Sequence, residues 1–169
     1  MSNTEIEFKY KINNQAEINK KLKDLGAKFV KEFESTDTYF MVPENKKGKK
    51  YLRVREQGKK VELAYHFAAS HIKTEEWEIA INDAQTAKEI LQKIGHKLDV
   101  IVKKIRKVYS YKNSEIVIDN IEGLGQYIEI ESPNLEELIK IEKLFGFNKS
   151  MRISDRGYPD MIRGYLISK

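Results

Sequence analysis

Carboxylates recur at alternate positions in two segments of the chain. Glu5 and Glu7 form one pair near the start, Glu129 and Glu131 form another towards the end, and Asp119 lies between the two segments. Carboxylate oxygens are the hard ligands that Mg²⁺ and Mn²⁺ prefer in proteins. The sequence therefore indicates a site for one of these two ions.

Basic side chains occur at the same alternating spacing in other segments, and they are Lys9, Arg53, Arg55, Lys104 and Arg106. Lysine and arginine donors suit phosphate oxygens, and arginine can bind them in a bidentate manner. Carboxylates for metal ions and cations that orient phosphates are together the groups that phosphoryl chemistry requires. The chain contains no glycine-rich Gly-x-x-x-x-Gly-Lys-Ser/Thr loop, so this chemistry would not be that of a P-loop enzyme.

The composition excludes several other classes of protein. The chain has 169 residues and no cysteine, so a disulfide framework, a thiolate nucleophile and a Cys-ligated metal site are excluded. The length suits one domain over residues 1–169, and the net charge of +5 is compatible with an anionic ligand. No apolar stretch is long enough to span a bilayer and the start lacks a secretory pattern, so we expect a cytoplasmic protein without a membrane partner.

Alternation of apolar and polar residues predicts eight strands, joined mostly by tight turns and interrupted by helices. The expected strands are 5–12, 27–42, 50–56, 61–67, 75–81, 100–111, 115–121 and 126–131. The expected helices are 15–25, a second that is capped by Asn82 or Asp83 and ends at Gly95, a third from after Pro133 to about residue 145, and a last one within 155–166. Short connections favour an antiparallel sheet with helices packed on it.

One face of nearly every expected strand carries ionised groups of both signs. In the first strand Phe8 and Tyr10 share one face, while Glu7 and Lys9 share the other. An open sheet could expose the charged face to water, or a closed barrel could turn it inward and place its apolar face under the helices. Because small barrels normally fill their interior with apolar side chains, a charged interior would be costly unless it held water, metal ions and a polyanion. The pattern itself leaves both architectures open.

At this point the chain resembles a known family. Glu5-Ile6-Glu7-Phe8-Lys9 matches the E-x-E-x-K signature that opens members of the CYTH superfamily, the triphosphate tunnel metalloenzymes. Further matches follow in the order of the family, and the last of them resembles the Arg-Ser-Tyr of class IV adenylyl cyclases. They are Tyr51-Leu52-Arg53-Val54-Arg55-Glu56, Glu76-Trp77-Glu78, Lys104-Ile105-Arg106, Ile118-Asp119 followed by Gly123-Leu124-Gly125-Gln126-Tyr127-Ile128-Glu129-Ile130-Glu131, and Arg156-Gly157-Tyr158.

The resemblance implies an α+β fold, in which an eight-stranded antiparallel closed β-barrel encloses a hydrophilic tunnel and helices pack outside. It also implies Mg²⁺ or Mn²⁺ as cofactor and a triphosphate as substrate, with a homodimer as an expectation and no nucleic-acid partner. The implied metal ligands are Glu5, Glu7 and Glu129, with Glu131 and Asp119 as further candidates. The implied triphosphate-binding residues are Lys9, Arg53, Arg55, His66, Lys104, Arg106 and Arg156, and Glu76 and Glu78 would line the tunnel.

The sequence departs from the family at one position of the fourth strand, where the cyclases have a lysine and this chain has His66. A neutral imidazole would weaken phosphate binding, whereas a protonated one could partly replace the lysine. The leading hypothesis is a class IV adenylyl cyclase, which converts ATP to cyclic AMP and pyrophosphate. The alternative is an inorganic tripolyphosphatase or thiamine triphosphatase. A non-catalytic module for polyphosphate or RNA ends is the third hypothesis, and the carboxylates argue against it because a pure anion binder gains nothing from them.

Overall fold

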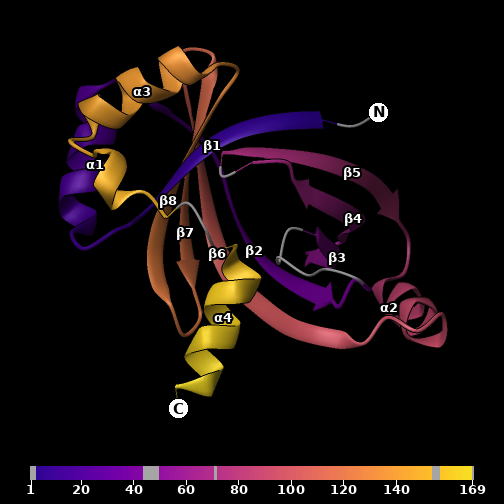
Figure 1. Ribbon diagram of the computed structural model, residues 1–169. Helices are drawn as coiled ribbons and strands as arrows, with labels where there is room; N and C mark the ends of the chain where they lie inside the picture. The colour runs from indigo at the N-terminus through magenta and orange to yellow at the C-terminus, as the bar shows by residue number, and fades with distance from the viewer. Residues whose placement is uncertain (1–2, 44–49, 71, 154–156, 169) are drawn as a thin grey trace.

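The computed structural model describes residues 3–43, 50–70, 72–153 and 157–168, and Figure 1 shows how its elements are arranged. The strands are β1 (Asn3–Lys11), β2 (Lys28–Phe40), β3 (Lys50–Gln57), β4 (Lys60–Ala68), β5 (Lys73–Ile81), β6 (Leu98–Tyr111), β7 (Ser114–Ile121) and β8 (Gly125–Ser132). The α-helices are α1 (Gln15–Asp24), α2 (Ala84–Lys93), α3 (Leu135–Leu144) and α4 (Tyr158–Ile167), and a short 3₁₀ helix, η1, covers Lys149–Met151.

The strands form a closed antiparallel barrel in the order β1-β5-β4-β3-β2-β6-β7-β8. This confirms the predicted fold and decides between the open sheet and the closed barrel. The two longest strands, β2 and β6, pair along most of their length, with register shifts between Phe29 and Lys31 and between Thr38 and Phe40. Such irregularities bend a strand and increase its twist, which helps a sheet to close on itself.

Local sequence explains where strands turn and where helices begin. The β3–β4 hairpin turns at Gly58, whose φ of 58° lies in the left-handed region that glycine adopts without strain. Helices α1, α2 and α3 begin after Asn14, Asp83 and Asn134, and each of these side chains accepts a hydrogen bond from the backbone N–H three residues on. The predicted helices therefore form, with ends that differ from prediction by at most three residues.

Two of the three apolar cores lie outside the barrel wall, beneath the helices. The third lies between α4 and the barrel, and it includes Tyr39 and Tyr158, which face the interior. Figure 1 shows α1 and α3 on one side of the barrel next to β1 and β8, and α2 on the opposite side. The largest core joins α1 and α3 to the outer faces of β1, β7 and β8 through Phe8, Tyr10, Ile12, Ile18, Leu22, Ile116, Ile118, Ile128, Ile130, Leu138, Ile141 and Phe145. A smaller core packs α2 on the β3–β4 hairpin through Val54, Leu91 and their neighbours. With the apolar faces buried outside, the charged faces are left to line the interior.

None of the helices in the described part of the chain is both long enough and apolar enough to cross a lipid bilayer.

A buried ion pair ties α3 to the segment that follows it and to β1. The Glu142 carboxylate is 4% exposed and accepts two hydrogen bonds of 2.6 Å from Arg152 and one of 2.8 Å from the Tyr10 hydroxyl. The Arg152 guanidinium also stacks on Phe8 at 3.5 Å from the ring centroid. The bidentate geometry offsets the cost of burying both charges.

Substituting Arg152→Ala should lower the free energy of unfolding by about 3 kcal/mol, because it leaves a buried carboxylate without its cation. Urea unfolding followed by circular dichroism measures this change. Lys140→Ala is the matched control, since it removes the exposed pair of Lys140 with Glu136 and should leave the unfolding midpoint unchanged. Equal stability of the two variants would contradict a structural role for the buried pair.

Candidate active site

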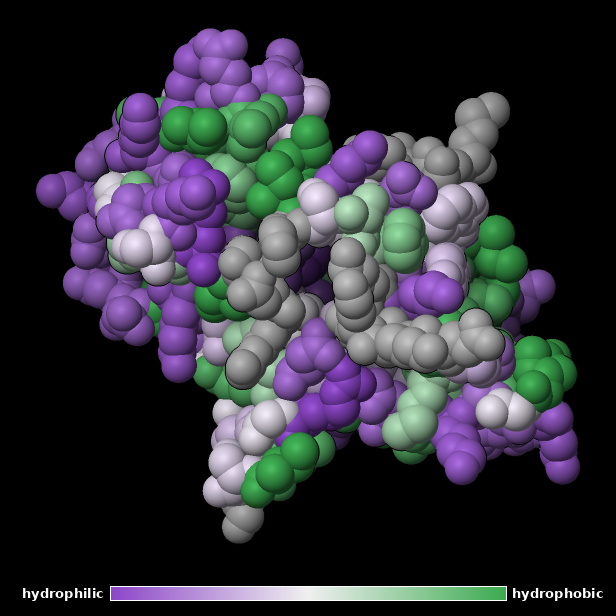
Figure 2. All heavy atoms as spheres, in the orientation of Figure 1, coloured by the Kyte–Doolittle hydropathy of each residue, from purple (hydrophilic) through white to green (hydrophobic). Residues whose placement is uncertain are grey.

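The barrel encloses a cavity of about 430 Å³ that is lined by residues from all eight strands and from the first turn of α4. Figure 2 shows this hollow near the centre of the molecule, on the side where α4 begins. The lining residues of each strand are those of its charged face. Strand alternation therefore places these side chains inside, as expected for the closed barrel.

Three carboxylates meet on the wall formed by β1 and β8. Glu7, Glu129 and Glu131 each bring an oxygen to a cluster whose atoms lie within 4.8 Å of one another. The register explains the cluster, because Glu7 lies opposite Glu131 in the antiparallel pair. Burial raises the pKa of Glu7, whereas Glu129 has a pKa well below its usual range because Lys9 and Arg106 outweigh its burial. An oxygen-rich, anionic group of this kind suits Mg²⁺ or Mn²⁺.

Lys9 lies beside the carboxylate cluster, with its Nζ 2.9 Å from Glu129 and 3.7 Å from Glu7. Its burial opposes the charged form, but these two carboxylates hold its pKa above the ordinary lysine value. Lys9 therefore remains a cation in the cavity at neutral pH. The sequence predicted its side chain at a phosphate site, which stays a prediction, and the structure places it against the carboxylate cluster.

Two arginines are held by buried aspartates on neighbouring strands. Arg106 donates bonds of 2.7 and 2.6 Å to Asp119 and one of 2.7 Å to Glu129. Arg55 donates two bonds of 2.7 Å to Asp37. Both aspartates are 0% exposed. Such bidentate pairs fix the plane of each guanidinium group, so the remaining N–H donors are oriented before a ligand binds.

Asp119 is thus in contact with a cation, and it does not belong to the carboxylate cluster found among the described residues. Its role as a metal ligand stays a prediction. Asp37 was not identified from the sequence, because β2 carries consecutive polar residues at 34–38 and alternation could not select its inner face. One feature of the sequence could have indicated Asp37: it is an acidic residue in the strand that precedes the Leu-Arg-x-Arg segment.

Lys104 lies between the two aspartates, with its Nζ 3.7 Å from Asp37 and 3.5 Å from Asp119. Burial and the neighbouring Arg106 lower the pKa of Lys104 to about 8, against the opposing effect of the aspartates. The lysine is therefore mostly charged at neutral pH and loses its charge in mildly alkaline solution.

The part of the wall next to β1 is formed by β5, β4 and β3. Arg53 lies 3.1 Å from Glu76 and 3.4 Å from Glu78, and the Nε2 atom of His66 lies 3.1 Å from the same oxygen of Glu76. Burial and the nearby Arg53 and Arg55 lower the pKa of His66 to about 2, so its imidazole is neutral in the free protein.

Glu62 lines the cavity but was not singled out from the sequence, and it forms an ion pair with Lys60. Burial and the carboxyl group of Glu62 raise the pKa of Glu78 to about 7. Glu78 is therefore close to half-protonated at neutral pH, because two neighbouring carboxylates do not both ionise readily in the cavity. Glu62 lay on the predicted charged face of its strand, which was the one signal that could have identified it.

The structure thus brings most of the predicted site residues to one cavity, although their roles stay predictions. The predicted residues that line it are Glu7, Lys9, Arg53, Arg55, His66, Glu76, Glu78, Lys104, Arg106, Glu129 and Glu131. The side chain of Glu5 and the whole of Arg156 lie outside the described residues. Tyr39, Tyr51 and Tyr158 also line the cavity, and the sequence indicated only a packing role for them, in the core or at the tunnel rim.

Known proteins resemble this chain along most of its length. The CYTH domain family matches residues 3–156. A protein of Methanocaldococcus jannaschii named as a "putative adenylate cyclase" is 31% identical over 159 residues, which are 86% of this chain and 91% of that protein. The PH1012 protein of Pyrococcus horikoshii has a TM-score of 0.82 at 28% identity, covering 92% of this chain and 97% of its own. A conserved hypothetical protein of Pyrococcus furiosus has a TM-score of 0.82 at 27% identity, with 92% and 98% covered.

The lowered pKa of Lys104 predicts a pH dependence for the binding of an anionic substrate. Above about pH 8 the free protein loses this charge, so kcat/KM should fall about tenfold per pH unit. Steady-state rates with a triphosphate at constant ionic strength measure the profile. In Lys104→Arg the guanidinium stays protonated, and the fall near pH 8 should disappear. The same fall in a folded Lys104→Arg variant would assign it to another group.

Proposed function

The chain belongs to the CYTH domain family, and on that premise we propose that it is a metal-dependent adenylyl cyclase of class IV, which converts ATP to cyclic AMP and pyrophosphate. The observation that carries the proposal is the meeting of a three-carboxylate cluster and seven lysine and arginine side chains at one enclosed cavity. Neither half of this arrangement would be stable there without the other, and both are required for phosphoryl chemistry.

Glu7, Glu129 and Glu131 would hold Mg²⁺ or Mn²⁺. When bound, such an ion neutralises charge on phosphoryl oxygens and stabilises a phosphate leaving group. Glu129 contributes an ionised carboxylate, and Lys9 at 2.9 Å orients it within the cluster. The donor set fits a hard divalent cation, because every ligand that it offers is a carboxylate oxygen.

Arg53, Arg55, Lys104 and Arg106 would bind the phosphate chain. Their charges act in a cavity that is partly closed to water, where an ion pair is stronger than at the surface. Arg55 and Arg106 are already oriented by their aspartates, so little reorganisation is needed when the ligand binds. For cyclisation, this alignment must place the ribose 3′-oxygen in line with the α-phosphorus and the departing pyrophosphate.

Hydrolysis of tripolyphosphate is the second candidate, and the character of the cavity wall favours it. Most of the lining side chains are ionised, and the apolar ones are few, among them Phe33 and Val108. A wall of this kind recognises phosphates and offers little apolar surface for a nucleobase. The name of the Methanocaldococcus jannaschii relative supports the cyclase. The substrates of the two candidate reactions differ in one respect: ATP carries a nucleoside and tripolyphosphate does not.

Product analysis separates the candidates. The purified protein is incubated with ATP and, separately, with inorganic tripolyphosphate, each with Mg²⁺ or Mn²⁺, at neutral and alkaline pH. Cyclic AMP and pyrophosphate formed in equal amounts from ATP would establish the cyclase. Orthophosphate released mainly from tripolyphosphate would establish the hydrolase, and binding of tripolyphosphate without turnover would establish a non-catalytic module.

The metal site is tested by Glu131→Gln, which removes one ligand charge with almost no change of volume. The dissociation constant for Mn²⁺, measured by calorimetry without substrate, should rise about tenfold or more. Glu115→Gln is the matched control, because Glu115 lines the same cavity opposite Glu131 but lies outside the carboxylate cluster. Equal affinities in the two variants would remove Glu131 from the metal site.

A further inference from the structure

The first turn of α4 brings a tyrosine into the cavity. Tyr158 lines the cavity, is 5% exposed, and its hydroxyl has no hydrogen-bond partner within the described part of the chain. A buried phenol that forms no hydrogen bond has lost its water without compensation, so native structures rarely keep one without a reason. The unsatisfied hydroxyl therefore points to a ligand that is absent from the free protein.

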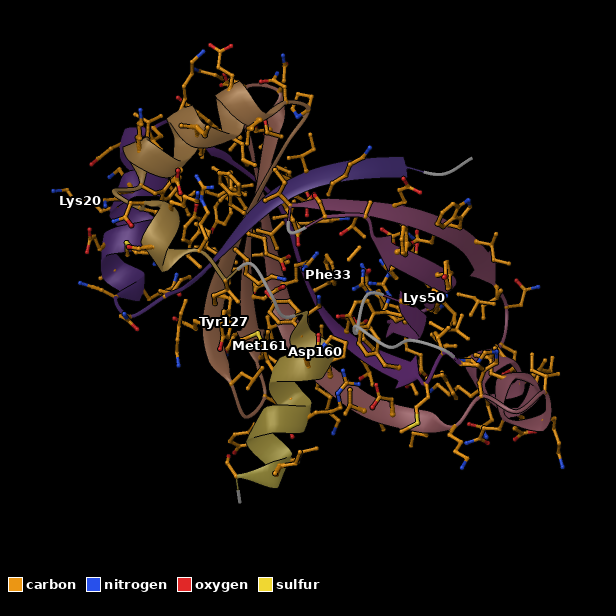
Figure 3. All side chains as sticks on the ribbon, viewed as in Figure 1. Lys20, Phe33, Lys50, Tyr127, Asp160 and Met161 are labelled. Carbon is orange, nitrogen blue, oxygen red and sulfur yellow. The ribbon has the colours of Figure 1, made fainter. Side chains whose placement is uncertain are left out.

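The position of Tyr158 is set by groups other than its own hydroxyl. Tyr51 of β3 donates a hydrogen bond of 2.6 Å to Asp160 in the first turn of α4. Arg163, one turn further along, forms ion pairs with Asp160 and with Asp99 of β6. Figure 3 shows Asp160 at the start of α4, beside the strands that enclose the cavity. These contacts anchor the helix to the barrel, so the hydroxyl is held in place without being needed for folding.

The ring of Tyr158 lies against the two buried lysines of the site. Its centroid is 4.3 Å from the Nζ atom of Lys9 and 5.3 Å from that of Lys104. Cation–π contacts of this kind are strongest where water is excluded. The ring therefore helps to hold both ammonium groups, while the hydroxyl remains available for another group in the same cavity.

The surroundings of the hydroxyl indicate what that group must be. Burial and the carboxylates of Glu129 and Asp119 raise the pKa of Tyr158 well above its ordinary value, so the phenol keeps its proton. It can donate a hydrogen bond, and it needs an acceptor. Lys9 and Lys104 cannot accept, and they attract anions to the same place. A phosphoryl oxygen satisfies both the hydroxyl and the two cations.

We propose that Tyr158 is a further substrate-binding residue, whose hydroxyl donates a hydrogen bond to a phosphoryl oxygen of the bound triphosphate while its ring positions Lys9 and Lys104. The inference rests on the proposed triphosphate site, and it holds for cyclisation and for hydrolysis alike. On this inference, α4 contributes a side chain to the binding site in addition to packing against the barrel.

Tyr158→Phe tests the hydroxyl alone, because the ring and its contacts with the lysines are retained. Binding of inorganic tripolyphosphate is measured by calorimetry with divalent metal removed, so that no turnover occurs. The dissociation constant should rise about tenfold to a hundredfold, which is the effect of losing one hydrogen bond to a charged group. The melting temperature of the free protein should stay the same or rise slightly, since the lost hydroxyl was unpaired.

Tyr127→Phe is the matched control. Tyr127 is 3% exposed and packs against Tyr158 with ring centroids 5.7 Å apart, but it does not line the cavity. This variant should bind tripolyphosphate as the wild type does. Wild-type affinity in Tyr158→Phe would overturn the inference while leaving the triphosphate site intact. A fall in melting temperature that matches the loss of affinity would make the hydroxyl structural. Failure of the wild-type protein to bind tripolyphosphate would overturn the proposed function itself.

Discussion

The rest of the structure depends on how charges are buried inside the barrel. Each ion removed from water costs several kcal/mol, and the cost is offset only where partners are close and well oriented. Arg55 with Asp37 and Arg106 with Asp119 meet this condition through bidentate hydrogen bonds, and Lys104 lies between the two aspartates. These pairs hold the two guanidinium groups in fixed orientations at the cavity.

A charged interior leaves most of the apolar side chains to be buried outside the wall. The helices α1, α2 and α3 cover part of the outer face of the barrel, with Leu138 and Ile141 of α3 fully buried against it. Most of the hydrophobic stabilisation therefore comes from outside the wall, while the binding groups lie inside it. A substitution that leaves the buried ion pairs intact, such as Tyr158→Phe, can consequently change binding with little effect on folding. The buried pair of Glu142 and Arg152 lies in the outer layer, where its loss affects stability alone.

The parts of this fold that could be predicted from sequence are those with a regular pattern. The strict alternation around Glu7 and Lys9 predicted the strand and its charged face. The same alternation fits an open sheet, so the closed barrel could be predicted only from the family resemblance. Asp37 was missed because its strand is polar on both faces at that point. Tyr158 was noticed only as part of the Arg156-Gly157-Tyr158 match, and no binding role was predicted for it, because its approach to Lys9 depends on how α4 docks on the barrel.

The electrostatics of the free cavity also bear on His66, which the resemblance places where the cyclases have a lysine. In the absence of an anion, Arg53 and Arg55 repel a further positive charge, and together with burial they keep His66 neutral. A fixed lysine charge at that position would add to this repulsion, whereas an imidazole avoids it by giving up its proton. A bound triphosphate brings several negative charges and acts in the opposite direction, which favours protonation of His66 and full charge on Lys104. The cavity is therefore suited to a polyanion in two ways. Its hydrogen-bond donors are already in position, and His66 and Lys104 can take up protons when the anion binds.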